Sequence, residues 1–126
     1  MATPATRIAI VDDDASVRKA LGRLLSASSF DIKSYGSARD FLKSLQLGTP
    51  DCLVVDLHMP ELTGFDLQRQ LMRSGINIPT IVITAYPEPG LRERCESAGA
   101  AAFLIKPFDA TALIGEINSA VHRDKH

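Results

Sequence analysis

The sequence has no tryptophan, only two cysteines and no long apolar run. Cys52 and Cys95 lie too far apart in the chain to match the short spacing of zinc ligands, and two free thiols fit a reducing cytosol. No apolar segment approaches the length of a membrane span, and residues 1–6 lack the apolar region of a signal peptide. The sequence therefore predicts a cytoplasmic protein without membrane contact.

Neither sign of charge is in large excess, because 14 Lys and Arg residues face 15 Asp and Glu residues, for a net charge of −1. Broad electrostatic binding of nucleic acid needs clustered positive charge. The charge balance therefore argues against broad capture of nucleic acid and leaves room only for a small basic patch. The 126 residues, 45% of them hydrophobic, suit one domain with its own core. We predict a single domain over residues 1–126 with its core at about 7–121.

Short apolar runs alternate with helical patterns along the chain. Four continuous runs predict strands buried on both faces of a parallel sheet, namely residues 8–11, 53–55, 81–83 and 101–105. Residues 30–35 alternate polar with apolar side chains and predict an edge strand. Apolar residues at helical spacing fill the gaps, with Ser37 expected to begin one helix and Gly99 to stop another. This order predicts a doubly wound five-stranded parallel sheet with helices on both faces.

Polar residues follow four of the predicted strands, where ligand sites form in open parallel sheets. They are Asp12, Asp13 and Asp14, then Asp56, Thr84 and Lys106. Neighbouring carboxylates repel one another unless a cation is present, and Mg²⁺ prefers oxygen ligands. A carboxylate can also act as a nucleophile towards phosphorus. Each residue alone has a structural explanation, which we keep for Asp14 as a helix N-cap; together they predict a site for Mg²⁺ and a phosphoryl group.

These segments resemble the receiver domains of two-component response regulators. The matching pieces are Val11-Asp12-Asp13, Asp56-Leu57-His58-Met59-Pro60, Gly64, Ile83-Thr84-Ala85, Ala98-Gly99-Ala100 and Lys106-Pro107-Phe108. The resemblance covers about residues 7–121 and is greatest to the FixJ-type regulators, which usually carry a C-terminal helix-turn-helix. It implies a flavodoxin-like fold of the receiver type, a place in a phosphorelay and a role in transcription regulation. It also implies that DNA is contacted only through an output domain absent from this chain.

The resemblance also implies a role for each site residue. Asp56 is similar to the phosphoacceptor, Asp13 to the direct Mg²⁺ ligand and Asp12 to the residue that holds metal-bound water. The backbone carbonyl of His58 is similar to the third protein ligand. Lys106 and Thr84 resemble the two contacts to the phosphoryl oxygens, Phe103 resembles the aromatic switch residue, and the Lys106–Pro107 bond is expected to be cis.

A histidine kinase is the implied phosphoryl donor, and the chain is expected to be a signalling switch that catalyses only its own phosphorylation and dephosphorylation. The surface formed by the helix near residues 91–98 and the strand at 101–105 is expected to change, with homodimerisation on phosphorylation. His58 and Tyr86 are bulky residues near the phosphoryl position. Pro87 and Pro89 are expected to stiffen the loop before that helix.

Two other classes of protein share some of these features. A Mg²⁺-dependent phosphohydrolase with an aspartyl-phosphate intermediate usually has a second acid two residues after the nucleophile, where this chain has His58. A flavodoxin-like nucleotide or flavin module needs a Gly-rich or Ser/Thr-rich phosphate loop after the first strand. Here that loop is Asp-Asp-Asp, which repels phosphate, so both alternatives are disfavoured.

Overall fold

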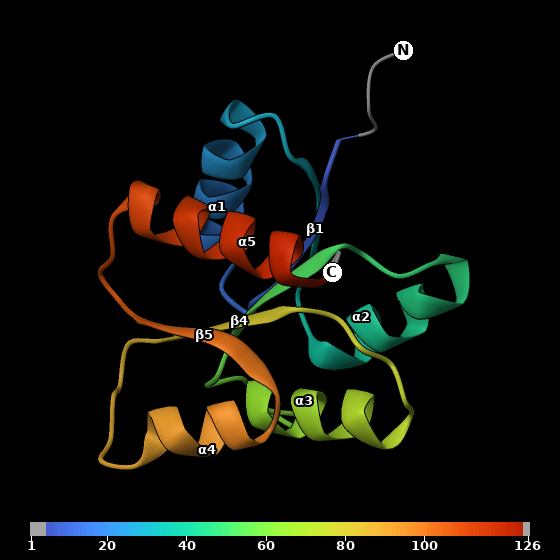
Figure 1. Cartoon of the computed structure of the whole chain (residues 1–126), viewed down its shortest axis with the longest axis vertical. Coiled ribbons are helices and arrows are strands. Elements are labelled where there is room, and N and C mark those ends of the chain that lie inside the picture. The colour runs from blue at the N-terminus through green and yellow to red at the C-terminus, as the bar shows by residue number, and fades with distance from the viewer. Residues whose placement is uncertain (1–4, 125–126) are drawn as a thin grey trace.

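The structure is a computed structural model that describes residues 5–124, and it contains one parallel sheet between two layers of helices (Figure 1). The strands are β1 (Arg7–Val11), β2 (Asp31–Tyr35), β3 (Cys52–Asp56), β4 (Thr80–Thr84) and β5 (Ala100–Ile105). The helices are α1 (Ala15–Ala27), α2 (Ala38–Ser44), α3 (Gly64–Arg73), α4 (Leu91–Ser97) and α5 (Ala110–Asp124), with a 3-10 turn η1 (Leu45–Leu47) after α2. The predicted fold class is confirmed.

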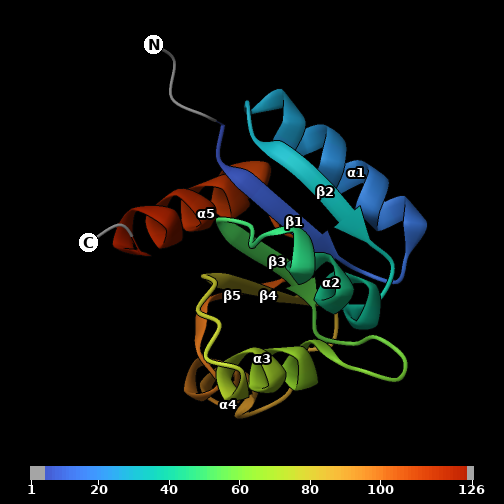
Figure 2. The ribbon, with the colours of Figure 1, turned by 90° about the vertical axis from the view of Figure 1, so that its right-hand side faces the viewer.

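The sheet has the strand order β2-β1-β3-β4-β5 and separates two hydrophobic clusters. Helices α1 and α5 cover one face, with Leu25 and Leu113 fully buried against the sheet (Figure 2). Helices α2, α3 and α4 cover the other face, where Phe41 and Leu67 are fully buried. The single domain over 1–126 stays a prediction, because residues 1–4 and 125–126 lie outside the described part of the chain.

The burial of each strand follows its sequence pattern. All five residues of β3 and of β4 are buried, as continuous apolar runs predict. The alternating segment forms β2 at one edge, as predicted, although the strand begins at Asp31 and Phe30 packs against the α1–α5 side. Strand β5 forms the other edge and leaves Ile105 42% exposed, which its continuous apolar run did not indicate.

Helix ends are fixed by side chains at several of the predicted positions. Asp14 caps α1 by accepting from the backbone N–H groups of Ser16 and Val17, and Ser37 caps α2. Gly99 follows α4 with a φ of 98°, so glycine suits its predicted place at the helix end. We did not predict the capping box of α3, in which Thr63 and Asp66 bond each other's backbone N–H groups.

Gly64 allows α3 to begin directly against the end of β3. A Cβ atom at this position would lie 2.8 Å from the carbonyl oxygen of Asp56 and 3.0 Å from the Cα atom of Leu57. The Gly64 N–H also donates to the Leu57 carbonyl at 3.0 Å. This close approach fixes the chain just after Asp56, and only glycine fits without a backbone shift.

We predict opposite effects for two glycine-to-alanine substitutions. Gly64→Ala should lower the free energy of unfolding by about 1–3 kcal/mol, because the added methyl group meets backbone atoms that must move. Gly22→Ala is the matched control: it lies in α1 with no atom within 4 Å of the added Cβ, and it should raise stability by about 0.5–1 kcal/mol. Urea unfolding measures both, and equal stabilisation by the two variants would contradict the close contact at Gly64.

Candidate functional site

Three of the four predicted strand ends meet through charged side chains. Asp12 and Asp13 follow β1, Asp56 ends β3, and Lys106 follows β5. Carboxylate oxygens of the three aspartates lie within 4.8 Å of one another. The Lys106 Nζ atom is 3.3 Å from Asp56 Oδ2 and 3.5 Å from Asp12 Oδ2. The structure therefore brings together four of the residues that the sequence singled out.

Asp12 is fully buried, whereas Asp13 is exposed. Burial raises the pKa of the Asp12 carboxyl; the hydrogen bond from the Asp14 backbone N–H opposes this, and the charge of Asp56 raises the pKa further. The site thus concentrates negative charge where water cannot fully solvate it, which favours a bound cation.

Lys106 supplies part of the missing positive charge. Burial alone would lower the pKa of its ammonium group, but the charges of Asp12 and Asp56 outweigh burial, so that its pKa is raised. Lys106 therefore stays protonated at neutral pH, as a contact to a phosphoryl oxygen requires. The Lys106–Pro107 peptide bond is cis, as predicted.

The Thr84 side chain is fully buried at the end of β4. Its hydroxyl oxygen accepts a hydrogen bond from the Tyr86 backbone N–H at 3.0 Å, and its carbonyl accepts from the Lys106 N–H at 2.8 Å. In this conformation the hydroxyl contacts the loop before α4, while the Thr84 backbone is bonded to the residue that carries the ammonium group.

His58 lies beside Asp56 through its backbone and contacts Tyr86 through its ring. The His58 N–H donates to Asp56 Oδ1 at 3.0 Å. The exposed rings of His58 and Tyr86 meet edge to face with 5.5 Å between their centroids. The histidine ring therefore packs on an aromatic neighbour, whereas the role of its backbone carbonyl as a metal ligand stays a prediction.

Phe103, the predicted switch residue, is 5% exposed and packs in the cluster that includes α4. The guanidinium carbon of Arg92 lies 5.2 Å from the centre of its ring. In the described conformation Phe103 therefore points inward and links β5 to α4.

The aspartate cluster fits a cation that prefers oxygen ligands. Two oxygens bound to the same Mg²⁺ lie at most about 4.2 Å apart, which is close to the spread of the cluster at 4.8 Å. Asp13 is exposed to solvent, and buried Asp12 keeps a carboxylate oxygen within 4.8 Å of one from Asp13. The donor set is therefore suitable for Mg²⁺ with water in the remaining positions.

Sequence reasoning did not predict a role for Arg18. Its Nη1 atom donates to the backbone carbonyl of Asp12 at 2.7 Å. Arg18 lies one turn after the acidic loop, and helical side chains tilt towards the helix N-terminus. That direction was the signal in the sequence that could have indicated the contact.

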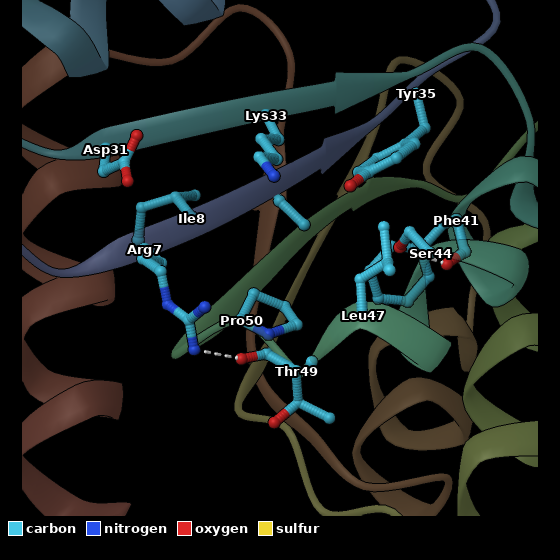
Figure 3. Close-up of a pocket in the computed structure, with 12 residues that line it drawn as sticks. Arg7, Ile8, Asp31, Lys33, Tyr35, Phe41, Ser44, Leu47, Thr49 and Pro50 are labelled. Carbon is cyan, nitrogen blue, oxygen red and sulfur yellow. Dashed lines mark hydrogen bonds between the residues drawn. The ribbon is translucent and has the colours of Figure 1, made fainter.

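A separate cavity of about 230 Å³ lies between β1, β2 and the α2–η1 segment (Figure 3). Lys33 and Tyr35 of β2 border it, as does Arg7, whose Nη2 atom donates to the Thr49 carbonyl at 2.7 Å. Neither Asp56 nor Lys106 lines this cavity, so it is distinct from the charged site.

Both cysteines are buried and free. Burial raises the pKa of the Cys52 thiol to about 12, and burial also raises the pKa of Cys95. Because the thiolate is the reactive form of cysteine, neither residue is suited to nucleophilic chemistry. No helix within residues 5–124 is both long and apolar enough to cross a membrane.

Comparison with known proteins identifies one family. The family model of the response regulator receiver domain matches residues 8–118. The transcriptional regulatory protein FixJ of Rhizobium meliloti is 40% identical over 111 residues, which are 88% of this chain and 54% of the relative. Nodulation protein W of Bradyrhizobium diazoefficiens is 36% identical over 116 residues, 92% of this chain and 51% of the relative. The chain thus spans about half the length of the curated relatives it matches.

Solved structures give the same result. The crystal structure of FixJ-N has a TM-score of 0.88 and 37% identity, covering 95% of this chain and 96% of the other. The response regulator StyR has a TM-score of 0.88 and 34% identity, covering 97% of this chain and 62% of the other. The resemblance to a FixJ-like receiver is confirmed by these matches.

We predict that Asp12→Asn stabilises the protein in magnesium-free buffer at neutral pH. The folded-state pKa of Asp12 is raised above its ordinary value of 3.8, so the contribution of this carboxyl to stability is fully present below that value and is lost as pH rises through the folded-state pKa. Neutralising it should raise the free energy of unfolding by about 1 kcal/mol, a common size for one substitution.

Urea unfolding at a series of pH values measures this effect. The gain should shrink as pH falls through the raised folded-state pKa of Asp12, because the carboxyl of the wild type then becomes protonated. Glu88→Gln is the control, because it removes one negative charge from an exposed loop residue and should change stability by less than about 0.5 kcal/mol. Destabilisation by Asp12→Asn at every pH would contradict the electrostatic account.

Proposed function

The chain belongs to the response regulator receiver domain family, and from that membership we propose that Asp56 accepts a phosphoryl group from a histidine kinase with Mg²⁺ held by Asp12, Asp13 and Asp56. A receiver domain is a signalling switch. The observation that carries the assignment of Asp56 is that its carboxylate lies in the aspartate cluster and also contacts Lys106. The kinase and the output of the whole protein belong to this proposal.

Each oxygen of the Asp56 carboxylate has a contact that holds the group in place for attack on phosphorus. Oδ1 accepts from the His58 N–H, and Oδ2 contacts Lys106 Nζ. One carboxylate oxygen forms the new O–P bond while the P–N bond of the donor phosphohistidine breaks, and the electron pair returns to the imidazole nitrogen. When bound, Mg²⁺ would neutralise charge on the carboxylates and on the phosphoryl oxygens.

Mg²⁺ is proposed to contact Asp13 and Asp56 directly, with the His58 carbonyl as the third protein ligand and Asp12 acting through water. The mixture of an exposed and two buried carboxylates supports this set. Asp14 stays outside it, because its side chain already accepts from the first N–H groups of α1. By this proposal the chain catalyses only its own phosphorylation and dephosphorylation.

Phosphorylation is proposed to act on α4 and β5 through Thr84. The Thr84 hydroxyl oxygen now accepts from the Tyr86 N–H, and we propose that rotation of this side chain towards a phosphoryl oxygen breaks that bond. Releasing that bond frees the loop before α4, and Phe103 with Arg92 joins α4 to β5. By this proposal, phosphorylation changes the relative populations of two conformations of the loop before α4 and of the surface formed by α4 and β5.

The changed surface is proposed to bind a second copy of this chain or an output domain outside this chain. DNA would be contacted only by that output domain. Edge strand β5 supports this, because Ile105 exposes apolar area next to the site. The two free thiols support a cytoplasmic location.

Phosphoryl labelling tests Asp56. With acetyl phosphate and Mg²⁺, intact mass spectrometry should show one phosphoryl group on the wild type and none on Asp56→Asn. Asp14→Asn is the matched control, since asparagine caps a helix as well as aspartate does, and it should still be labelled. Equal labelling of wild type and Asp56→Asn would overturn the assignment.

Sedimentation with and without beryllofluoride tests self-association. Beryllofluoride should shift the wild type towards a dimer by about tenfold or more in the association constant, within the usual range of allosteric coupling. Ile105→Glu should remove the shift, because it places a charge on the β5 edge. Leu47→Glu should keep the shift, because Leu47 is 90% exposed and lies near β1 and β2, whereas β5 forms the opposite edge of the sheet. A wild type that stays monomeric in both conditions would exclude the dimer.

A further inference from the structure

Every polar group of Asp12 has a partner, and the partners come from different parts of the fold. Its N–H donates to the Tyr35 carbonyl at 3.1 Å. Its Oδ1 accepts from the Asp14 N–H at 2.9 Å, and its Oδ2 contacts Lys106. Its own carbonyl accepts from Arg18 at 2.7 Å. Two of these partners use side chains. Lys106 belongs to the proposed phosphoryl site, whereas Arg18 does not.

The path of the Arg18 side chain is shaped by its neighbours. Arg18 is the fourth residue of α1, and its side chain runs back over the N-terminus of its own helix. The guanidinium group lies against Gly36, where an added Cβ would be 3.3 Å from Nη1 and 3.6 Å from Cζ. The turn between β2 and α2 thus leaves space that the guanidinium group occupies.

The Asp12 carbonyl and the Asp13 N–H belong to one planar peptide unit. A donor that fixes the carbonyl therefore also fixes the Asp13 Cα atom, from which the carboxylate side chain starts. We propose that Arg18 is a positioning residue that holds this peptide and so aims the Asp13 carboxylate at the Mg²⁺ position. This inference rests on the proposed function and adds to it a residue that contacts neither the ion nor the phosphoryl group.

Two explanations of Arg18 predict opposite signs for its removal. If Arg18 acted only as a positive charge near the aspartates, its loss would strengthen Mg²⁺ binding, because a repelled cation would meet a more negative site. If Arg18 positions the peptide, its loss weakens binding, because the Asp13 carboxylate is no longer held in place. The affinity for Mg²⁺ therefore separates the two.

The test is a Mg²⁺ titration of Arg18→Met, followed by the backbone amide NMR shifts near residues 12–14 and 56–58. We expect the dissociation constant to rise about tenfold, the lower end of the usual effect of a lost outer partner, and the Asp12 carbonyl ¹³C shift to move with the lost hydrogen bond. Arg23→Met removes the same charge from an exposed position of α1 and should leave Mg²⁺ affinity unchanged. Asp13→Ala gives the reference for a lost direct ligand.

Arg18→Lys keeps the charge but loses the guanidinium fork, and it carries the test if the methionine variant does not fold. Its Mg²⁺ affinity should stay below that of the wild type. Full wild-type affinity together with a shifted Asp12 carbonyl ¹³C signal, which reports the lost hydrogen bond, would show that this bond does not position Asp13 and would overturn the proposal. Unchanged or tighter binding by Arg18→Met would do the same. A wild type that binds no Mg²⁺ is a different result, because it overturns the proposed metal site and the role of Arg18 with it.

Discussion

The constraint on which the site depends is the burial of negative charge at the carboxyl edge of the sheet. Asp12 is fully buried and Asp56 nearly so, and both lie beside exposed Asp13. One ammonium group, that of Lys106, compensates part of this charge, and backbone N–H groups of Asp14 and His58 each hold one carboxylate oxygen. Without a cation the arrangement is incompletely neutralised, and this is what makes it receptive to Mg²⁺. The parallel sheet produces the arrangement, because all of its strands end at the same edge.

The same geometry joins the site to a surface. Lys106 follows β5, and its backbone N–H is bonded to the Thr84 carbonyl, so the two groups suited to phosphoryl oxygens lie on neighbouring strands. Thr84 reaches the α4 loop through Tyr86, and Phe103 of β5 packs beneath Arg92 of α4. Under the proposed function, a change at the hydroxyl would be transmitted through contacts that already exist between the strand ends and α4.

Much of the fold and the site could be predicted because their signals are local. The continuous runs of β3 and β4 and the alternation of β2 indicated buried and edge strands, and the residues after four strands indicated the charged cluster. The exposed end of β5 could not be predicted, since a buried central strand and an edge strand covered by α4 share one apolar pattern. The inward position of Phe103 could not be predicted either, because it follows from packing in the apolar cluster that includes α4, and the apolar pattern of the fifth strand does not report that packing. The position of Arg18 one turn into α1 could have indicated its contact with the acidic loop, but the space at Gly36 that the guanidinium group occupies could not be predicted from the sequence.

Backbone placement explains how repelling carboxylates can be held so near one another. Side chains alone would rotate apart, because each gains by moving towards water. Here Gly64 brings α3 against the Asp56 carbonyl, and Arg18 and Tyr35 hold the Asp12 backbone from two sides. The main chain at the ends of β1 and β3 is therefore held in place without a bound ion. This lowers the conformational entropy that is lost when the ion binds. Without a bound cation, the carboxylates of such a site repel one another, and a bound cation removes that repulsion. The same carboxylates therefore lower the stability of the ion-free protein and favour binding of the cation.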